Sequence, residues 1–155
     1  MAIKDSGDRT AFSTGAVRDM QDNKGRCDLL PLEEITEFLE DDNDVLFHLK
    51  RYEETEDIEY LYFALGAFAN AAYSGDRVDM VLDVSVHFAE GAEKYGVNNW
   101  QKGLPEWSYL SSGIRHYLKW KRGDNDERHD RAFVWNILCL LWTIENVNEE
   151  VTAND

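Results

Sequence analysis

Proline and cysteine are scarce in this sequence. Its 155 residues include two prolines, Pro31 and Pro105, and two cysteines, Cys27 and Cys139. Two cysteines without metal-type spacing exclude a disulfide scaffold, and we expect them to be buried or idle thiols. Because helix breakers are so few, the long stretches between them favour helices over strands.

Long apolar runs and excess positive charge are missing as well. Acidic residues interrupt every apolar stretch before it reaches the ~18 residues of a membrane span. The N-terminus lacks the apolar segment of a secretion signal, so we expect a cytoplasmic protein that does not bind membranes. Sixteen Lys and Arg against 31 Asp and Glu give a net charge of −15, which argues against duplex nucleic acid as a partner. Walker and Rossmann nucleotide motifs are absent too.

What is present is a chain of single-domain length with a helical pattern. Residues 1–30 are polar and contain three glycines, so we expect an N-terminal arm, followed by a helical domain over residues 31–150. Apolar spacing and flanking breakers predict helices that begin near Pro31, run over about 57–75, 77–95 and 106–121, and resume after residue 126. The sequence therefore predicts an all-α bundle of about four to six helices.

Two pairs of acidic residues have the spacing of a metal site in a helical bundle. Glu90 and Glu93 are three residues apart in a predicted helix, and Glu127 and Asp130 repeat this spacing. Such pairs project from one face of a helix, and facing pairs hold metal ions in bundle proteins. Oxygen ligands suit Mg²⁺ or Mn²⁺ better than Zn²⁺. The alternative is that both pairs are ordinary exposed charges in a very acidic chain.

Basic and polar residues between these pairs are candidates for binding a triphosphate, which must be neutralised as it is cleaved. Arg115 beside His116 is the first choice, whereas Lys94 has an alternative role in an i, i+4 ion pair with Glu90. Trp100 lies in a polar loop, where stacking on a base is an alternative to core packing. The candidates for the phosphates, base and sugar are Lys94, Asn99, Trp100, Lys102, Arg115 and His116.

Five ordered blocks of the sequence resemble one family. They are FSTGAVRD (Phe12 to Asp19), KGRCDLLP (Lys24 to Pro31), HFAEGAEKYGVNNWQKGLP (His87 to Pro105), SGIRHYLKW (Ser112 to Trp120) and RGDNDERHDRAFVWN (Arg122 to Asn136). Together they resemble the phage and prophage dATP/dGTP diphosphohydrolases, relatives of the MazG-like all-α nucleotide pyrophosphohydrolases. The likeness is weakest over about residues 40–76.

The resemblance implies a MazG-like all-α fold and a homo-oligomer, a dimer or tetramer, in the host cytoplasm if phage-encoded. It implies hydrolysis of dATP or dGTP to the monophosphate and pyrophosphate with Mg²⁺ or Mn²⁺. It also implies that cations of the N-terminal arm fold over the bound triphosphate; these are Arg18, Lys24 and Arg26.

The family's metal ligands come from a Glu-x-x-Glu pair and a later Glu-x-x-Asp pair. By resemblance these fall on the catalytic set Glu90, Glu93, Glu127 and Asp130. Because the family often has a basic residue at position 93, Asp126 and His129 are alternative ligands. A carboxylate that is not fully engaged with metal, Glu93 or Asp126, is expected to take the proton from the attacking water.

A different function is suggested by the local charge of the acidic middle. Residues 31–60 hold twelve acids and two bases, Lys50 and Arg51, and thus contribute −10 of the net charge of −15. Catalysis does not require this charge. The alternative prediction is therefore a non-catalytic helical adaptor that docks a basic protein partner through this segment.

Overall fold

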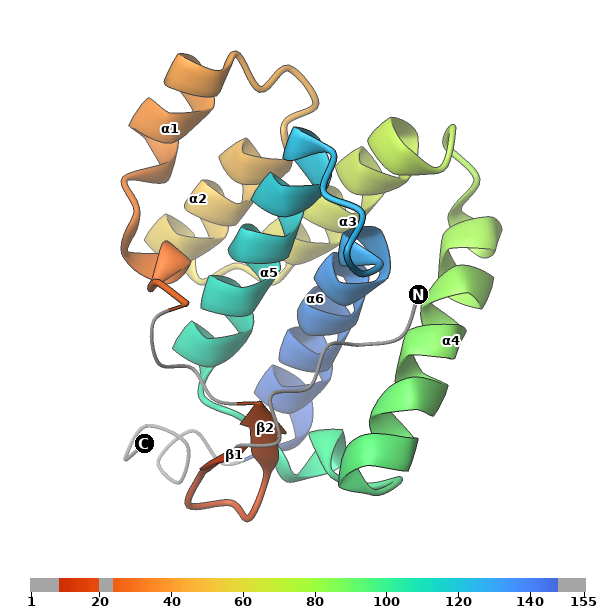
Figure 1. Ribbon diagram of the computed structural model, residues 1–155. Coiled ribbons are helices and arrows are strands. Elements are labelled where there is room, and N and C mark those ends of the chain that lie inside the picture. The colour runs from red at the N-terminus through yellow and green to blue at the C-terminus, as the bar shows by residue number, and fades with distance from the viewer. Residues whose placement is uncertain (1–8, 20–23, 148–155) are drawn as a thin grey trace. The chain divides into compact units, whose positions relative to one another are not determined.

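The computed structural model describes residues 9–19 and 24–147. Within these residues it contains six α-helices and a short hairpin, so the predicted all-α fold of four to six helices is confirmed. The helices are α1 (Leu32–Leu39), α2 (Val45–Thr55), α3 (Glu59–Ala72), α4 (Arg77–Tyr95), α5 (Glu106–Arg122) and α6 (His129–Asn146) (Figure 1). None of the helices in this part of the chain has the length and hydropathy needed to cross a bilayer.

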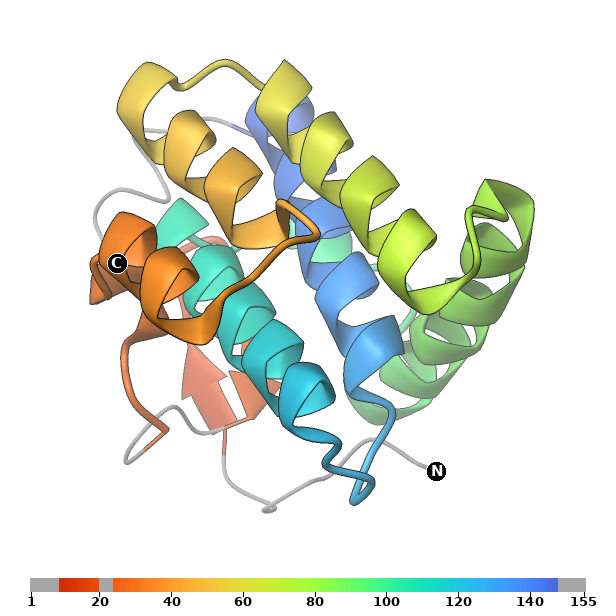
Figure 2. The same cartoon turned by 90° about the horizontal axis from the view of Figure 1, so that it is seen from above.

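The chain divides into two compact units, one of which is formed by Leu29–Asp83. In this unit α2 packs along α3, and α1 contacts α2 (Figure 2). Helix α2 was not predicted from the sequence, because it lies in the strongly acidic segment of residues 31–60. It forms because Val45, Leu46, Leu49 and Tyr52 lie on one face at helical spacing and are all buried. Its acidic residues therefore occupy the remaining surface.

The other unit comprises residues up to Asp28 and from Val84 onward, as far as they are described. Its centre is the antiparallel pair of α5 and α6. Fully buried side chains on both helices fill the space between them, including Tyr109, Ile114, Tyr117, Phe133, Ile137 and Leu140. Cys139 is buried and Cys27 half-buried, and both are free thiols as the spacing predicted.

An aromatic cluster joins α4 to α6 in the same unit. The ring of Trp100, in the 3₁₀-helix η2 (Trp100–Lys102), lies 5.4 Å from Phe88 and 5.0 Å from Trp142 between centroids. Phe88 also approaches Trp135, at 6.1 Å. These edge-on and tilted contacts are the usual packing of buried aromatic rings. They hold the C-terminal half of α4 against α6.

The described part of the N-terminal arm contains an antiparallel hairpin of β1 (Arg9–Ala11) and β2 (Val17–Asp19). Phe12 and Ala16 in its turn are buried, and Thr14 Oγ1 donates a hydrogen bond of 2.6 Å to the carbonyl of Gly103. Residues 1–8 and 20–23 lie outside the described residues. The hairpin brings Arg18 into contact with Ser108 of α5 and Asn136 of α6.

Candidate functional site

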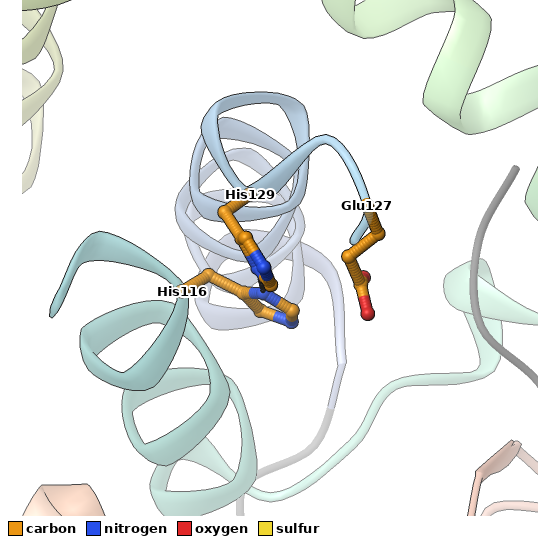
Figure 3. A group of neighbouring side chains, drawn as sticks. All are labelled: His116, Glu127 and His129. Carbon is orange, nitrogen blue, oxygen red and sulfur yellow. Dashed lines mark hydrogen bonds between the residues drawn. The ribbon is translucent and has the colours of Figure 1, made fainter. Parts of the chain in front are cut away.

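Two histidines meet where α5 and α6 are joined (Figure 3). Gly123, with φ of +87°, ends α5, and the chain returns so that His129, the first residue of α6, lies against His116 of α5. Their Nδ1 atoms are 2.9 Å apart. Nε2 of His129 lies 2.7 Å from Oδ1 of Asp126. The result is a continuous hydrogen-bonded chain from His116 through a buried histidine to an exposed carboxylate.

His116 is the neutral member of the pair at neutral pH. Burial is the main reason why the pKa of His116 lies well below 6.5, and the nearby positive charge of Arg115 lowers it further. Since the two Nδ1 atoms are at hydrogen-bonding distance, one of them carries a proton and the other accepts it. The site thus has a half-buried imidazole, His116, that is neutral at neutral pH and has one ring nitrogen available as an acceptor or ligand.

Carboxylates surround these histidines in two groups. In the first, ligand atoms of His116, Glu127 and His129 all lie within 4.8 Å of one another; in the second, those of Asp124, Asp126 and His129 do so. His129 belongs to both groups. Arg122 donates from Nε to Oδ1 of Asp124 at 2.7 Å, and this bond lowers the pKa of the Asp124 carboxyl.

A pocket of about 190 Å³ opens beside the same residues. The loop between α5 and α6 and the start of α6 supply most of its lining, which includes Trp120, Asp124, Glu127, Arg128, His129 and Asp130. The pocket therefore gives a small polar ligand access to the carboxylates and to a buried histidine.

The structure gathers only part of the predicted metal-ligand set. Asp126 and Glu127 belong to the groups around His129, whereas Glu90, Glu93 and Asp130 belong to neither group among the described residues. Glu90 and Glu93 lie on α4 at the predicted helical spacing. The arrangement of four carboxylates around one ion therefore stays a prediction.

Asp130 has a close cationic neighbour. Arg128 donates from Nε and Nη2 to its two carboxylate oxygens at 3.0 and 2.9 Å, and the backbone N–H of Arg131 donates to it at 2.9 Å. A metal ion that used Asp130 as a ligand would thus compete with a bidentate ion pair.

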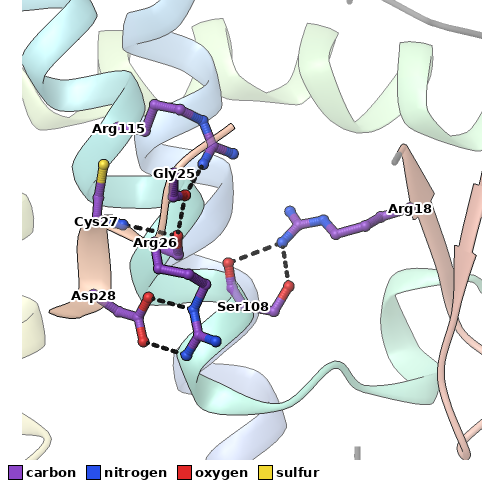
Figure 4. Close-up of polar contacts among 8 residues, drawn as sticks. Arg18, Gly25, Arg26, Cys27, Asp28, Ser108 and Arg115 are labelled. Atoms are coloured by element: carbon purple, nitrogen blue, oxygen red, sulfur yellow. Dashed lines mark hydrogen bonds and ion pairs between the residues drawn. The ribbon is translucent and has the colours of Figure 1, made fainter. Parts of the chain in front are cut away.

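Arg18 of β2 reaches the α5–α6 pair from the hairpin (Figure 4). Its Nη1 donates to the carbonyl and hydroxyl oxygens of Ser108 at 3.0 and 2.7 Å, and its Nη2 donates to Oδ1 of Asn136 at 3.0 Å. The guanidinium lies 5.9 Å from the ring centroids of both Tyr109 and Trp135. Burial lowers the pKa of Arg18 to about 10, so the group is still charged at neutral pH. These three acceptors are neutral, so they orient the charge without cancelling it.

Arg115 lies near both the arm and the acidic loop. It donates from Nη1 to the carbonyl of Gly25 at 3.3 Å and from Nη2 to the hydroxyl of Ser112 at 3.0 Å. Burial lowers the pKa of Arg115, and the negative charge of Glu127 opposes that shift. Arg115 and Glu127 are therefore close enough to influence each other electrostatically. Three of the predicted substrate ligands lie near one another, because the positive charges of Arg18 and Arg115 both lower the pKa of His116.

The remaining predicted substrate ligands lie elsewhere in the unit. Arg26 forms a bidentate ion pair with Asp28, with both distances 2.8 Å, and stacks 3.9 Å above the ring of Trp107. Lys24 and Lys102 are exposed, Lys94 is half-buried and Asn99 is buried. Trp100 packs in the aromatic cluster described above. Their roles toward a substrate stay predictions.

Asp124 and His87 were not among the predicted site residues. Asp124 is two residues before Asp126 in the loop that follows Gly123, and this local spacing was the available signal. His87 is buried, with its ring 5.7 Å from Trp135. Burial, followed by the positive charges of Arg131, Arg18 and Lys94, lowers the pKa of His87 to about 4, against a smaller raising effect of Asp130.

Comparison with known proteins adds one match. The family model described as dATP/dGTP diphosphohydrolase, N-terminal, matches residues 77–153. This range includes α4, α5, α6 and the acidic loop, and thus the histidine pair with its carboxylates. No curated protein and no solved structure matches the chain.

Proposed function

From the membership of this chain in the dATP/dGTP diphosphohydrolase family, we propose that it hydrolyses dATP and dGTP to the monophosphate and pyrophosphate with a divalent metal ion, Mg²⁺ or Mn²⁺. The family description names the nucleotide and the class of reaction. The metal dependence, the bond cleaved and the residues that act belong to the proposal.

The proposal rests on one observation: a cationic side chain lies near a carboxylate that belongs to a group of metal-type ligands. The Arg115 guanidinium lies within electrostatic range of Glu127, which belongs to a group of metal-type ligands together with His116 and His129. A metal–triphosphate complex requires both kinds of group, because the ion needs anionic ligands while the phosphates need cations.

Arg18 and Arg115 are the groups proposed to hold the phosphates. Arg18 is suited to this because its neutral acceptors leave its charge available to an anion. Moving a charge out of water is costly unless an opposite charge compensates for it, and a bound phosphate would supply that compensation. Lys94 and Lys102, and the arm residues Lys24 and Arg26, are proposed as weaker contributors to the same attraction.

The carboxylates are proposed to hold the metal and to accept the proton. When bound, the ion would lower the pKa of a water molecule and stabilise the departing pyrophosphate. Glu127 is the ligand that the group of His116 and His129 favours, and Glu90, Glu93 and Asp130 complete the proposed set. Water attacks the α-phosphorus, the bond to the bridging oxygen breaks, and pyrophosphate leaves. Asp126, which is not fully engaged with the metal, takes the proton of the water.

The first test is a product assay. Incubating the protein with each of the eight common nucleoside triphosphates and either Mg²⁺ or Mn²⁺, followed by chromatography, should yield dAMP or dGMP together with pyrophosphate. Chelation of the metal should stop the reaction. Release of inorganic phosphate in place of pyrophosphate would contradict the proposed cleavage between the α and β phosphorus atoms.

The second test examines Arg18 by substitution. Arg18→Gln keeps a polar side chain but removes the charge, and hydrogen bonds to charged groups contribute about 1.5–3 kcal/mol. We therefore expect kcat/KM to fall about 10- to 100-fold, since each 1.4 kcal/mol corresponds to about a factor of ten. The matched control is Arg51→Gln in α2, which removes an exposed ion pair with Glu54. Equal activity of both variants would exclude Arg18 from substrate binding.

Assembly into a homo-oligomer is a further part of the proposal. The α4 helix exposes an apolar stripe of Val78, Val81, Leu82 and Val86, with exposed fractions of 70%, 55%, 66% and 40%. Such a stripe favours contact with another surface of the same kind. Light scattering should give the mass of a dimer or tetramer, and Leu82→Glu should reduce that mass.

A second candidate function is the docking of a basic protein by the acidic helices. The observation in its favour is that Phe38 on α1 is 84% exposed and Phe47 on α2 is 49% exposed among acidic neighbours. Salt-sensitive binding of a basic protein, together with nucleotides that stay intact in the product assay, would favour this function over hydrolysis.

A further inference from the structure

The histidine pair has a feature that hydrolysis by Mg²⁺ does not require. Mg²⁺ binds oxygen atoms in near-ideal octahedral geometry, whereas imidazole nitrogen is a preferred ligand of Zn²⁺, Fe²⁺, Co²⁺ and other first-row transition metals. Here two imidazoles, His116 and His129, come from different helices and direct their Nδ1 atoms at each other across 2.9 Å. A site built for Mg²⁺ alone would have little use for them.

The distances suit two nitrogens that share one ion. A metal–nitrogen bond of about 2.1 Å places two ligands at a right angle about 3 Å apart. The observed separation of 2.9 Å between the Nδ1 atoms agrees with this value. An oxygen of Glu127 lies within 4.8 Å of the ligand atoms of both histidines, and Figure 3 shows the three side chains together. Two histidines and one carboxylate are a common ligand set for such metals.

A histidine that binds a metal ion through one ring nitrogen usually donates a hydrogen bond from the other, and Asp126 is placed to accept it. Its Oδ1 is 2.7 Å from Nε2 of His129, on the opposite side of the ring from Nδ1. A proton on Nε2 that is donated to this carboxylate leaves the lone pair of Nδ1 free to bind a metal ion. The same hydrogen bond fixes the orientation of the ring.

The surroundings leave room for further ligands. The pocket of about 190 Å³ is lined by both Glu127 and His129. Water or a phosphate oxygen could therefore complete the coordination of an ion held by three protein ligands. Arg115 influences both His116 and Glu127 electrostatically, so an anionic ligand would meet a positive charge there as well.

We propose that His116, Glu127 and His129 bind one first-row transition-metal ion, with Asp126 orienting His129. This deepens the proposed function by naming the class of ion at the acidic loop, but the binding itself does not depend on nucleotide hydrolysis. In the metal-free protein the short Nδ1–Nδ1 contact is a hydrogen bond between the rings, which the ion replaces.

Cobalt is a suitable probe because Co²⁺ bound to nitrogen and oxygen ligands absorbs visible light. The full-length chain without an affinity tag is titrated with Co²⁺ in the absence of nucleotide, followed by absorbance and by calorimetry. We expect one bound ion per chain, and a large excess of Mg²⁺ should leave it in place. Absence of cobalt bands, or displacement by Mg²⁺ as easily as by Zn²⁺, would overturn the proposal.

Variants separate a specific site from general attraction to an acidic chain. Loss of one ligand in His116→Gln should weaken Co²⁺ binding at least about 100-fold, and loss of the orienting group in Asp126→Asn about 10-fold. The matched control is His48→Gln, which removes a histidine of α2 that is packed against Phe63. His48→Gln should bind Co²⁺ like the unchanged protein. Equal binding by His116→Gln and the unchanged chain would exclude the site.

A folding defect must not be mistaken for a lost ligand. Circular dichroism and melting temperature are therefore compared for each variant, and Glu127→Gln serves as a second ligand variant with little change in volume. It should lower Co²⁺ affinity at least about 10-fold while its melting temperature stays close to that of the unchanged protein. Unaltered affinity in Glu127→Gln would remove the carboxylate from the site and contradict the three-ligand proposal.

The two proposals can fail independently. Hydrolysis of dATP with Mg²⁺ alone, together with no Co²⁺ binding, would uphold the proposed function and overturn the histidine site. Tight Co²⁺ binding that depends on His116, together with no hydrolysis under any metal, would do the reverse.

Discussion

Acidification should destabilise this protein through one buried side chain, His87. The folded protein lowers the pKa of His87 to about 4, whereas an unfolded histidine titrates near 6.5. Between these values the unfolded chain binds a proton that the folded chain does not. The free energy of unfolding must therefore fall as pH falls below about 6.5, and the contribution of neutral His87 is fully present only above that pH.

The size of the effect follows from the pKa difference. A shift of about 2.5 units corresponds to about 3 kcal/mol at pH 4, because each unit is worth about 1.4 kcal/mol. Burial is the main cause, and the groups around His87 do not cancel it. Arg131, Arg18 and Lys94 all oppose a further positive charge, and these effects outweigh the favourable effect of Asp130.

The assay compares the unchanged protein with His87→Gln, which cannot titrate. Urea unfolding is measured at intervals between pH 4 and pH 8, and the difference in unfolding free energy removes the effect of the many carboxylates. We expect a constant difference above pH 7 and a change of about 3 kcal/mol in favour of the variant by pH 4. His48→Gln should give a change of the same sign, because burial lowers the pKa of His48 as well. Parallel curves for His87→Gln and the unchanged protein would refute the reasoning.

Two further predictions concern the packing that supports the site. Tyr109→Phe should lower the free energy of unfolding, measured in urea, by about 1–3 kcal/mol. The reason is that the buried hydroxyl of Tyr109 accepts a hydrogen bond of 3.2 Å from the backbone N–H of Leu104. A loss below about 0.5 kcal/mol would contradict this. Gly103→Ala should lower the melting temperature and cost about 1–3 kcal/mol, since φ is +87° and a Cβ would lie 3.0 Å from Cγ1 of Val147. Its control, Gly91→Ala inside α4, has nothing within 4 Å of the added carbon and should stabilise the protein by about 0.5–1 kcal/mol; destabilisation by both changes to the same degree would count against the strain.

The helices show which local features could be predicted from the sequence. The predicted helix over residues 77–95 agrees with α4, Arg77–Tyr95, and the predicted helix over 106–121 agrees with α5 to within one residue. Both end at a glycine with positive φ, Gly96 and Gly123, which is a strictly local signal. In contrast, α2 was not predicted, because its four buried apolar side chains are interspersed with charged and polar residues. Local periodicity is informative only where the buried face is broad.

The candidate site could be predicted only in part from the sequence. Spacing along the chain selected Glu127, positive charge selected Arg115 beside His116, and the family resemblance added Asp126. The structure places these residues near one another. The pairing of α4 carboxylates with the later acidic pair could not be derived in the same way. Helical spacing fixes which side chains share a face, but it does not fix which faces meet.

By itself the sequence determined the all-α fold, the ends of its main helices and the family to which the chain belongs, because each depends on residues close together in the chain or on ordered motifs. The tertiary structure decided that His116 and His129 share a hydrogen bond and that Arg18 reaches Asn136, 118 positions away. These contacts depend on how α5, α6 and the hairpin pack. Packing is set by the complementary shapes of many buried side chains at once, and no single spacing in the sequence records it.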